Sequence, residues 1–266
     1  MNKRFFVAAA FATVVFTSGA HAADLPRKYV KAPVPVAAPF SWTGFYIGAH
    51  GGGGWGQNNW QDFIDPINPA NVTPGPDANY KVSGAMAGGQ IGYNWQTGWT
   101  VFGIEADASW ADIKGSGNNA PQIVAGVPSG GVPTCMQQQA SGCSSKVEAL
   151  GTITGRVGAA FDHTLLYMKG GAAWAITKHT VTGVGLVGLG LGPISASTSE
   201  TRWGWTIGAG LEYAFASNWS VKAEYNYIDL GSERVNFTYQ PPQFTGASAN
   251  LDQVLHVAKA GVNYRF

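Results

Sequence analysis

The sequence lacks any hydrophobic run long enough to cross a membrane as a helix. Hydrophobic residues make up 45% of its 266 residues and aromatic residues 12%, yet no apolar segment reaches the roughly 18 residues that such a helix needs. Charged residues are scarce, at 12%. High aromatic content without a hydrophobic helix, together with 37 glycines spread through strand-like segments, indicates an all-β protein.

Neither sign of charge dominates, and cysteine is nearly absent. The formal net charge is +1, and it becomes about −1 if Lys3 and Arg4 are removed with a secretory leader. A nearly neutral chain offers no electrostatic basis for binding nucleic acid. The two cysteines, Cys135 and Cys143, stand in a chain directed to export, where oxidation is permitted. We expect them to form one disulfide, with two free thiols as the alternative.

Motifs for catalysis or cofactor binding are also missing. Residues 151–156, GTITGR, resemble a phosphate loop but lack its Lys-Ser/Thr ending. The histidines at 50, 163, 179 and 256 show no metal-ligand spacing, and no nucleophile elbow or paired acid–base group occurs. We therefore expect no enzyme, no cofactor and no metal site. His179 is the one histidine to consider for haem.

The N-terminal region predicts export. Residues 1–22 have a basic start, an apolar core over 5–16 and the sequence AHA before the expected cut, which is the pattern of a signal peptide. Residues 23–41 contain four prolines among basic residues, which is typical of an extended periplasmic tether. The remaining chain, 42–266, is the candidate folded domain.

This domain is built from segments with period-two alternation, which indicates β-strands. The last one, VLHVAKAGVNYRF over 254–266, is long enough for the roughly 9–11 residues with which a tilted strand crosses a bilayer. Because it ends the chain, we expect it to pair with the first strand and close a barrel without an edge open to lipid. The eight segments are 44–55, 83–95, 99–112, 146–161, 165–178, 202–215, 219–229 and 254–266.

The connections alternate strictly in length. Tight turns are expected at 96–98, 162–164 and 216–218, and long connections at 57–79, 113–145, 179–200 and 230–250. Short periplasmic turns, long outer loops and two bands of aromatic residues are the pattern of outer-membrane barrels. The sequence therefore predicts an all-β, eight-stranded, antiparallel, up-and-down and closed transmembrane β-barrel.

The charged residues indicate which face of each strand points inward. An outward Lys or Arg at mid-bilayer would cost roughly 2–4 kcal/mol, so the charged faces should line the lumen. Such a lumen is just wide enough for side chains to fill. We interpret the charges as a polar plug, with a narrow ion path as the alternative. The expected lumen network is Glu105, Asp107, Glu148, Arg156, Lys169, Arg202, Glu212, Lys222, Glu224, Lys259 and Arg265.

The chain resembles a known family. The leader, the Pro/Lys tether, the start WTGFYIG, the eight alternating strands and the final Tyr-Arg-Phe are similar to the small outer-membrane barrels of alphaproteobacteria. These are surface antigens of the porin family, related to the OmpA membrane domain. The resemblance implies an outer-membrane location. It also implies that Tyr264 and Phe266 form the C-terminal signal recognised by the barrel-assembly machinery.

The resemblance does not select one activity, since members are described as structural, adhesive, haem-binding or weakly pore-forming. We expect a structural and surface-interaction role in envelope integrity, adhesion or antigenicity; the alternatives are a small diffusion channel and a haem-binding surface protein. Expected partners are outer-membrane lipid, the assembly machinery, and host or cell-surface contacts through the loops. The apolar residues 183–192 either extend a hairpin above the membrane or contact a partner.

Overall fold

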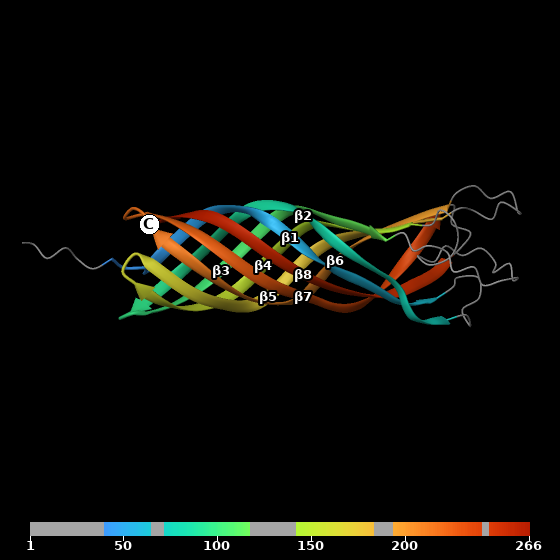
Figure 1. The fold of residues 1–266 in the computed structure, drawn as a ribbon, viewed down its shortest axis with the longest axis horizontal. Coiled ribbons are helices and arrows are strands. Elements are labelled where there is room, and N and C mark those ends of the chain that lie inside the picture. Colours follow the sequence, from blue (N-terminus) through green and yellow to red (C-terminus); the bar gives the residue numbers. More distant parts are fainter. Residues whose placement is uncertain (1–39, 65–71, 118–141, 184–193, 241–244) are drawn as a thin grey trace, which may run out of the picture. The chain divides into compact units, whose positions relative to one another are not determined.

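The computed structural model of the chain describes residues 40–64, 72–117, 142–183, 194–240 and 245–266. These residues form one closed barrel of antiparallel strands, each hydrogen-bonded to its neighbours in sequence (Figure 1). The strands are β1 (Gly44–Ile64), β2 (Val72–Thr97), β3 (Thr100–Gly117), β4 (Gly142–Phe161), β5 (Thr164–Gly183), β6 (Ile194–Ala214), β7 (Trp219–Gln240) and β8 (Thr245–Arg265). The predicted eight-stranded, up-and-down barrel is confirmed.

The barrel closes between its first and last strands. β8 runs antiparallel to β1, with Ala49 opposite Val262 and Trp55 opposite His256. The prediction that the C-terminal strand pairs with the first strand is therefore confirmed. Closure satisfies the backbone groups of both strands within the membrane, where no water is available to them.

The three tight turns lie at the end of the barrel that also holds the C-terminus (Figure 1). The β2–β3 hairpin turns at Gly98 and the β4–β5 hairpin at Asp162, with φ angles of 63° and 53°. Two-residue hairpin turns need such positive angles because they follow the twist of the strands. We call this the short-turn end and the opposite end the long-connection end.

The strands extend further at the long-connection end than the sequence predicts. β2 begins at Val72 instead of residue 83, and β8 begins at Thr245 instead of residue 254. The predicted long connections are therefore partly strand. β5 continues to Gly183, which pairs with Ile194 of β6, so the hairpin interpretation of this region is confirmed as far as that pair. Within the described residues, no helix is long and apolar enough to cross a membrane.

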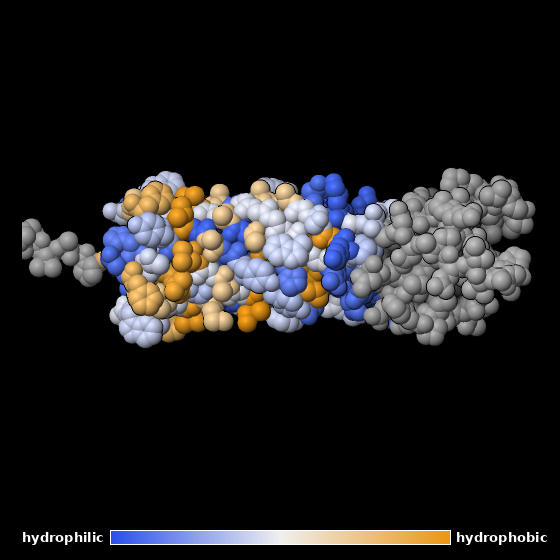
Figure 2. All heavy atoms as spheres, viewed as in Figure 1, coloured by the Kyte–Doolittle hydropathy of each residue, from blue (hydrophilic) through white to orange (hydrophobic). Residues whose placement is uncertain are grey.

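The outward side chains change character along each strand, as β3 illustrates. Phe102, Ile104 and Trp110 point outward and are between 52% and 81% exposed. Further along the same face come the exposed Asp112 and Lys114. Figure 2 shows the same trend, with strongly hydrophilic residues gathered towards the long-connection end. The apolar band therefore ends near Trp110, Trp174 and Trp203, which we call the upper belt.

The inward side chains change in the opposite sense. On β3 the inward Glu105 and Asp107 are followed by the inward Ala111 and Ile113, and all four are buried. Below the upper belt the strand is apolar outside and polar inside, whereas above it the strand is polar outside and apolar inside. The alternation thus changes phase where lipid gives way to water, and this is why the predicted strands stop there.

Several predictions concern segments outside the described residues. The signal peptide and nearly all of the tether lie in 1–39, and Cys135 lies in 118–141. Cys143 is in β4, and the disulfide stays a prediction. Partner binding by residues 183–192 also stays a prediction, because the described part of the chain reaches only the first of them.

Candidate functional site

Eight ionisable side chains meet in the middle of the barrel, and we call them the charged layer. They project inward from β3, β4, β5, β6, β7 and β8, and all are buried. Four are carboxylates and four are cations, so the layer is formally neutral. Its members are Glu105, Asp107, Arg156, Lys169, Glu212, Lys222, Glu224 and Lys259.

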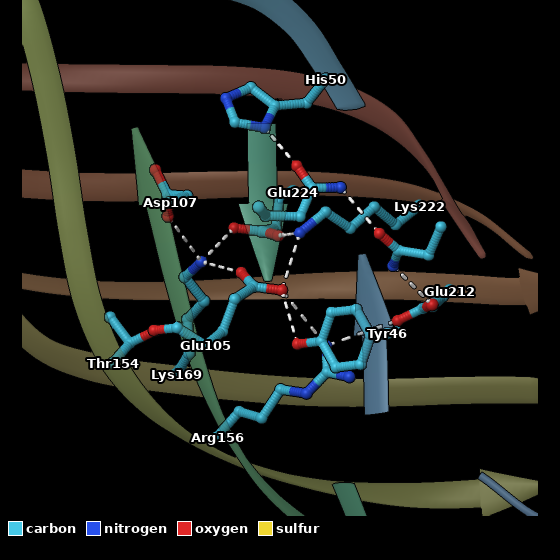
Figure 3. A network of polar contacts seen from close by, with 12 residues as sticks. Tyr46, His50, Glu105, Asp107, Thr154, Arg156, Lys169, Glu212, Lys222 and Glu224 are labelled. Carbon is cyan, nitrogen blue, oxygen red and sulfur yellow. Dashed lines mark hydrogen bonds and ion pairs between the residues drawn. The ribbon is translucent and has the colours of Figure 1, made fainter. Parts of the chain in front are cut away.

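Glu105 is the centre of this layer (Figure 3). Its carboxylate accepts hydrogen bonds from Lys169 Nζ at 2.8 Å and Lys222 Nζ at 3.0 Å. The Tyr46 hydroxyl donates to it at 2.8 Å. Arg156 Nη1 lies 3.6 Å from Glu105 Oε2. One carboxylate therefore lies between three buried cations and reduces their mutual repulsion, which is strong in a medium of low dielectric constant.

Glu224 and Asp107 complete the pairing of the lysines. Glu224 lies 2.6 Å from Lys169 Nζ and 2.7 Å from Lys222 Nζ. Asp107 lies 3.1 Å from Lys259 Nζ and 3.7 Å from Lys169 Nζ. Lys259 is also 3.7 Å from Glu224. Each of the three lysines therefore lies within 4 Å of at least two carboxylates. Charges buried without such pairing would cost several kcal/mol each.

Arg156 links the lysine cluster to Glu212. Its Nη1 is 3.4 Å from Glu212 Oε2, and its Nε donates to Asn94 Oδ1 at 2.8 Å. The guanidinium carbon lies 4.7 Å from the centre of the Tyr46 ring and 5.0 Å from that of Tyr167. Contacts of this kind stabilise an arginine cation over an aromatic face. The planar group is therefore held on several sides.

Neutral polar side chains extend the network across the barrel. Asn263 donates to Glu212 at 2.8 Å, and Gln90 donates to Asn263 at 2.7 Å. His50 hydrogen-bonds to Gln90, and its other ring nitrogen lies 2.6 Å from Ser109 Oγ. Asn263 and Gln90 do not stand out in the sequence, since an inward Asn or Gln carries no signal beyond its place in the alternation.

An apolar layer fills the lumen between the charged layer and the long-connection end. Ile113, Leu251 and Leu255 have at most 1% of their surface exposed. Gly54 also faces in, and a Cβ on it would overlap the Ile113 side chain, so the layer leaves no room there. We call this set the upper apolar layer: Tyr80, Val82, Met86, Ala111, Ile113, Val147, Leu150, Ala173, Ala175, Ile228, Leu230, Val235, Leu251, Leu255 and Val257.

A smaller apolar group closes the short-turn end. Trp42 is 1% exposed and packs with Val101, Leu165 and Tyr167. Its indole nitrogen donates to the Asp162 carbonyl at 3.2 Å. Trp42, two residues before β1, thus turns under the barrel and covers the lumen. Its place just ahead of the first strand was the only signal in the sequence.

The structure separates three of the predicted lumen residues from the charged layer. Glu148 was predicted inside, and the structure corrects this: it lies on the outer surface, 3.8 Å from Lys146, with 44% of its side chain exposed. The register shifts between Val147 and Ala149, and this β-bulge turns Val147 inward. Arg265 lies at the short-turn end, with its guanidinium over the Phe40 ring at 4.4 Å.

Arg202 is buried, but it serves the barrel wall above the charged layer. β6 and β7 lose their common register between Ala196 and Trp205. Arg202 reaches across this irregularity, and its Nη2 donates to the carbonyls of Gly231 at 2.7 Å and Leu251 at 2.8 Å. It therefore joins β6 to β7 and β8 where the strand ladder does not.

His179 belongs to a buried polar chain above the upper belt. The Ser145 hydroxyl lies 2.6 Å from His179 Nδ1 and 2.5 Å from the Tyr80 hydroxyl. His179 follows Trp174 by about 16 Å of strand, which places it beyond the membrane. Burial, and to a lesser extent the charge of Arg202, lowers the pKa of His179 to about 3. The ring has no exposed surface, so the structure gives haem binding at His179 no support.

We expect acid to destabilise the barrel through His179. The unfolded chain takes up the imidazole proton near pH 6.5, but the folded state does so only near pH 3. Between these values the unfolded state holds more protons. The free energy of unfolding therefore decreases as the pH is lowered, by up to about 1.4 kcal/mol per pH unit. Urea unfolding near pH 7 and near pH 4 measures this, and His179→Gln should lose less stability on acidification than wild type. Equal losses would contradict the prediction.

Metal binding has no evident site in the part of the chain that the structure describes. No group of three or more His, Cys, Asp or Glu side chains is placed there to hold an ion. The carboxylates of the charged layer are instead engaged by lysine and arginine.

Comparison with known proteins finds outer-membrane barrels. Residues 9–266 match the family described as outer membrane protein beta-barrel domain. The 31 kDa outer-membrane immunogenic protein of Brucella melitensis biotype 1 is 33% identical over 259 residues, which are 95% of each chain. The 22 kDa outer membrane protein of Rhizobium leguminosarum bv. viciae is 31% identical over 206 residues, 75% of this chain and 69% of that protein. The solved structure of OprG from Pseudomonas aeruginosa aligns with a TM-score of 0.48 and 11% identity, over 84% of this chain and 97% of that one.

Proposed function

The chain belongs to the outer membrane protein beta-barrel domain family and is an outer-membrane protein, and from this premise we propose a structural and surface-interaction role with a lumen that does not conduct. Barrels of this kind place short turns in the periplasm and longer loops outside. The long-connection end is therefore assigned to the cell surface and the Trp42 end to the periplasm.

The single observation that carries the proposal is the filling of the lumen in three layers. The charged layer, which is formally neutral, lies between the upper apolar layer and the small apolar group around Trp42. An ion crossing the barrel would have to separate buried ion pairs and then pass the upper apolar layer, most of whose side chains offer it no polar partner. Both steps oppose conduction, because a lone charge in an apolar interior is strongly disfavoured.

A surface-interaction role is supported by the exposed end and by the relatives. The Brucella melitensis relative is named immunogenic, and this supports a surface-exposed long-connection end in this chain. The described strands carry that end beyond the upper belt. The filled lumen makes the barrel a support for contacts with other surfaces, in adhesion and envelope integrity.

The proposal is tested by conductance of the refolded protein in planar bilayers. Wild-type protein, with folding checked by its heat-modifiable mobility on gels, is expected to give no steady current steps. Reproducible steps that scale with salt concentration would contradict a closed lumen and favour the diffusion channel.

A matched pair of variants tests which layer holds the seal. Lys169→Ala removes contacts with Glu105, Asp107 and Glu224, whereas Lys178→Ala removes an exposed lysine outside the barrel. Openings confined to Lys169→Ala would identify the charged layer as the barrier. Silence in both variants would assign the seal to the apolar layers.

A further inference from the structure

Three lysines form a straight row on the outer surface of the barrel. Lys114 of β3 lies directly opposite Lys146 of β4, which lies directly opposite Lys178 of β5. We call Lys114, Lys146 and Lys178 the lysine row. Like charges directly opposite each other on neighbouring strands destabilise a sheet. The row therefore has an unfavourable self-energy, which a bound anion would relieve.

The carboxylates of the barrel compensate this row incompletely. Asp112 lies 3.0 Å from Lys114 Nζ and 3.5 Å from Lys146 Nζ, and Glu148 lies 3.8 Å from Lys146 Nζ. Two carboxylates thus face three lysines, and among the described residues Lys178 has no carboxylate within ion-pair distance. These pairs are exposed and therefore weak, so a stronger anionic ligand can displace them.

Hydroxyl groups continue the site on its outer side. Ser116 lies opposite Ser144, and Ser144 lies opposite Thr180, one step beyond the lysine row on the same three strands. The lysines and these hydroxyls line one groove of about 700 Å³. Cationic groups beside hydroxyl donors are the chemistry that binds phosphate oxygens.

The row lies where the apolar wall ends. On β3 it follows Trp110 of the upper belt, and on β5 it follows Trp174. Below it the same outer face presents Ile153, which is 59% exposed, to the hydrocarbon. A molecule with a phosphate head and acyl chains could therefore meet both surfaces at once. A free phosphate ion would use only the upper one.

The exposed charges around the barrel rim are also unevenly distributed. Lys81, exposed on β2, extends the positive side, whereas Asp229 of β7 and Asp252 of β8 supply outward carboxylates on the opposite side. An anion approaching at this level is thus directed to β2–β5.

We propose that the lysine row binds the phosphate groups of a phosphorylated lipid of the outer leaflet, whose acyl chains lie against the wall below. The assignment rests on the outer-membrane location and on the orientation given under the proposed function. It does not depend on whether the lumen conducts, so the two ideas can fail separately.

Binding is tested with the protein in phosphatidylcholine nanodiscs, using lipopolysaccharide and its dephosphorylated form as probes. One lysine near an anionic headgroup contributes about fivefold in affinity. The Lys114→Gln, Lys146→Gln, Lys178→Gln triple variant should therefore bind phosphorylated lipopolysaccharide on the order of 100-fold more weakly. Wild type should bind the dephosphorylated probe about as weakly. Arg234→Gln, which removes an exposed cation from β7, is the control and should bind like wild type.

Three results would overturn the proposal. They are equal binding of both probes by wild type, unchanged affinity in the triple variant, and full competition by inorganic phosphate at the same phosphate concentration. Should the triple variant fail to fold, Lys178→Gln alone is expected to lose about fivefold, and unchanged binding by that variant is equally decisive. Bilayer conductance of the same variants reports separately on the lumen.

Discussion

Replacing Glu105 by glutamine is expected to lower the free energy of unfolding by about 3–5 kcal/mol. Glu105 faces Lys169, Lys222 and Arg156 within 3.6 Å. The amide keeps the size of the side chain but removes its charge, which leaves the buried layer with one uncompensated positive charge. Urea unfolding of the refolded protein in lipid vesicles, followed by tryptophan fluorescence, measures the change.

Glu148→Gln is the matched control for this prediction. The sequence predicts both carboxylates inside, but the structure places Glu148 outside, 3.8 Å from Lys146. An exposed pair contributes roughly 0–1 kcal/mol, so this variant should unfold almost like wild type. A loss comparable to that of Glu105→Gln would show that Glu148 faces the lumen and that the bulge at Val147 is wrongly placed.

Leu255→Ala is expected to cost about 2–5 kcal/mol. Leu255 has no exposed surface, lies opposite Ile228 across β7–β8, and packs in the upper apolar layer. Truncation would leave a cavity among side chains drawn from opposite sides of the lumen. The same unfolding measurement detects the loss.

Val254→Ala provides the comparison on the other face of the same strand. Val254 points outward and is half-buried at the rim, so its truncation should cost under about 1 kcal/mol. If Val254→Ala were as costly as Leu255→Ala, the phase change above the upper belt would be wrong. Leu255→Ala should also stay silent in bilayers, since the charged layer below it is untouched.

Much of the membrane part of the fold was accessible from the alternation alone. Lipid penalises an outward charge strongly, so Glu105, Lys169 and Lys222 could be assigned to the lumen without coordinates. The final strand needed a partner, and pairing with β1 was the simplest one. Both inferences hold because hydrocarbon surrounds the outer face along the whole membrane part of the barrel, so that face is apolar throughout.

The same reasoning failed above the upper belt. There the outer face meets water and the inner face is largely an apolar core, so Asp112 points out and Ile113 points in. If the alternation of the membrane part, apolar outside and polar inside, is assumed to continue, these residues break it and are interpreted as the end of a strand. Lys178, the last residue of the predicted segment 165–178, is exposed and in phase with the outer face of this upper part.

The Glu148 error has a local cause. The β-bulge in the β4–β5 ladder inserts one residue, and period two then assigns every following side chain to the wrong face. Nothing in the sequence around Val147 indicates this bulge, because it arises from pairing with the neighbouring strands β3 and β5.

The sequence by itself determined that eight alternating segments close into a barrel and that most of their charges point inward, because hydrocarbon excludes both ionised groups and unpaired backbone. Only the tertiary structure decided which carboxylate meets which lysine, that Trp42 and an apolar layer enclose those pairs, and that three lysines align outside. These are contacts between strands far apart in the chain, and they depend on register and bulges that no single strand encodes.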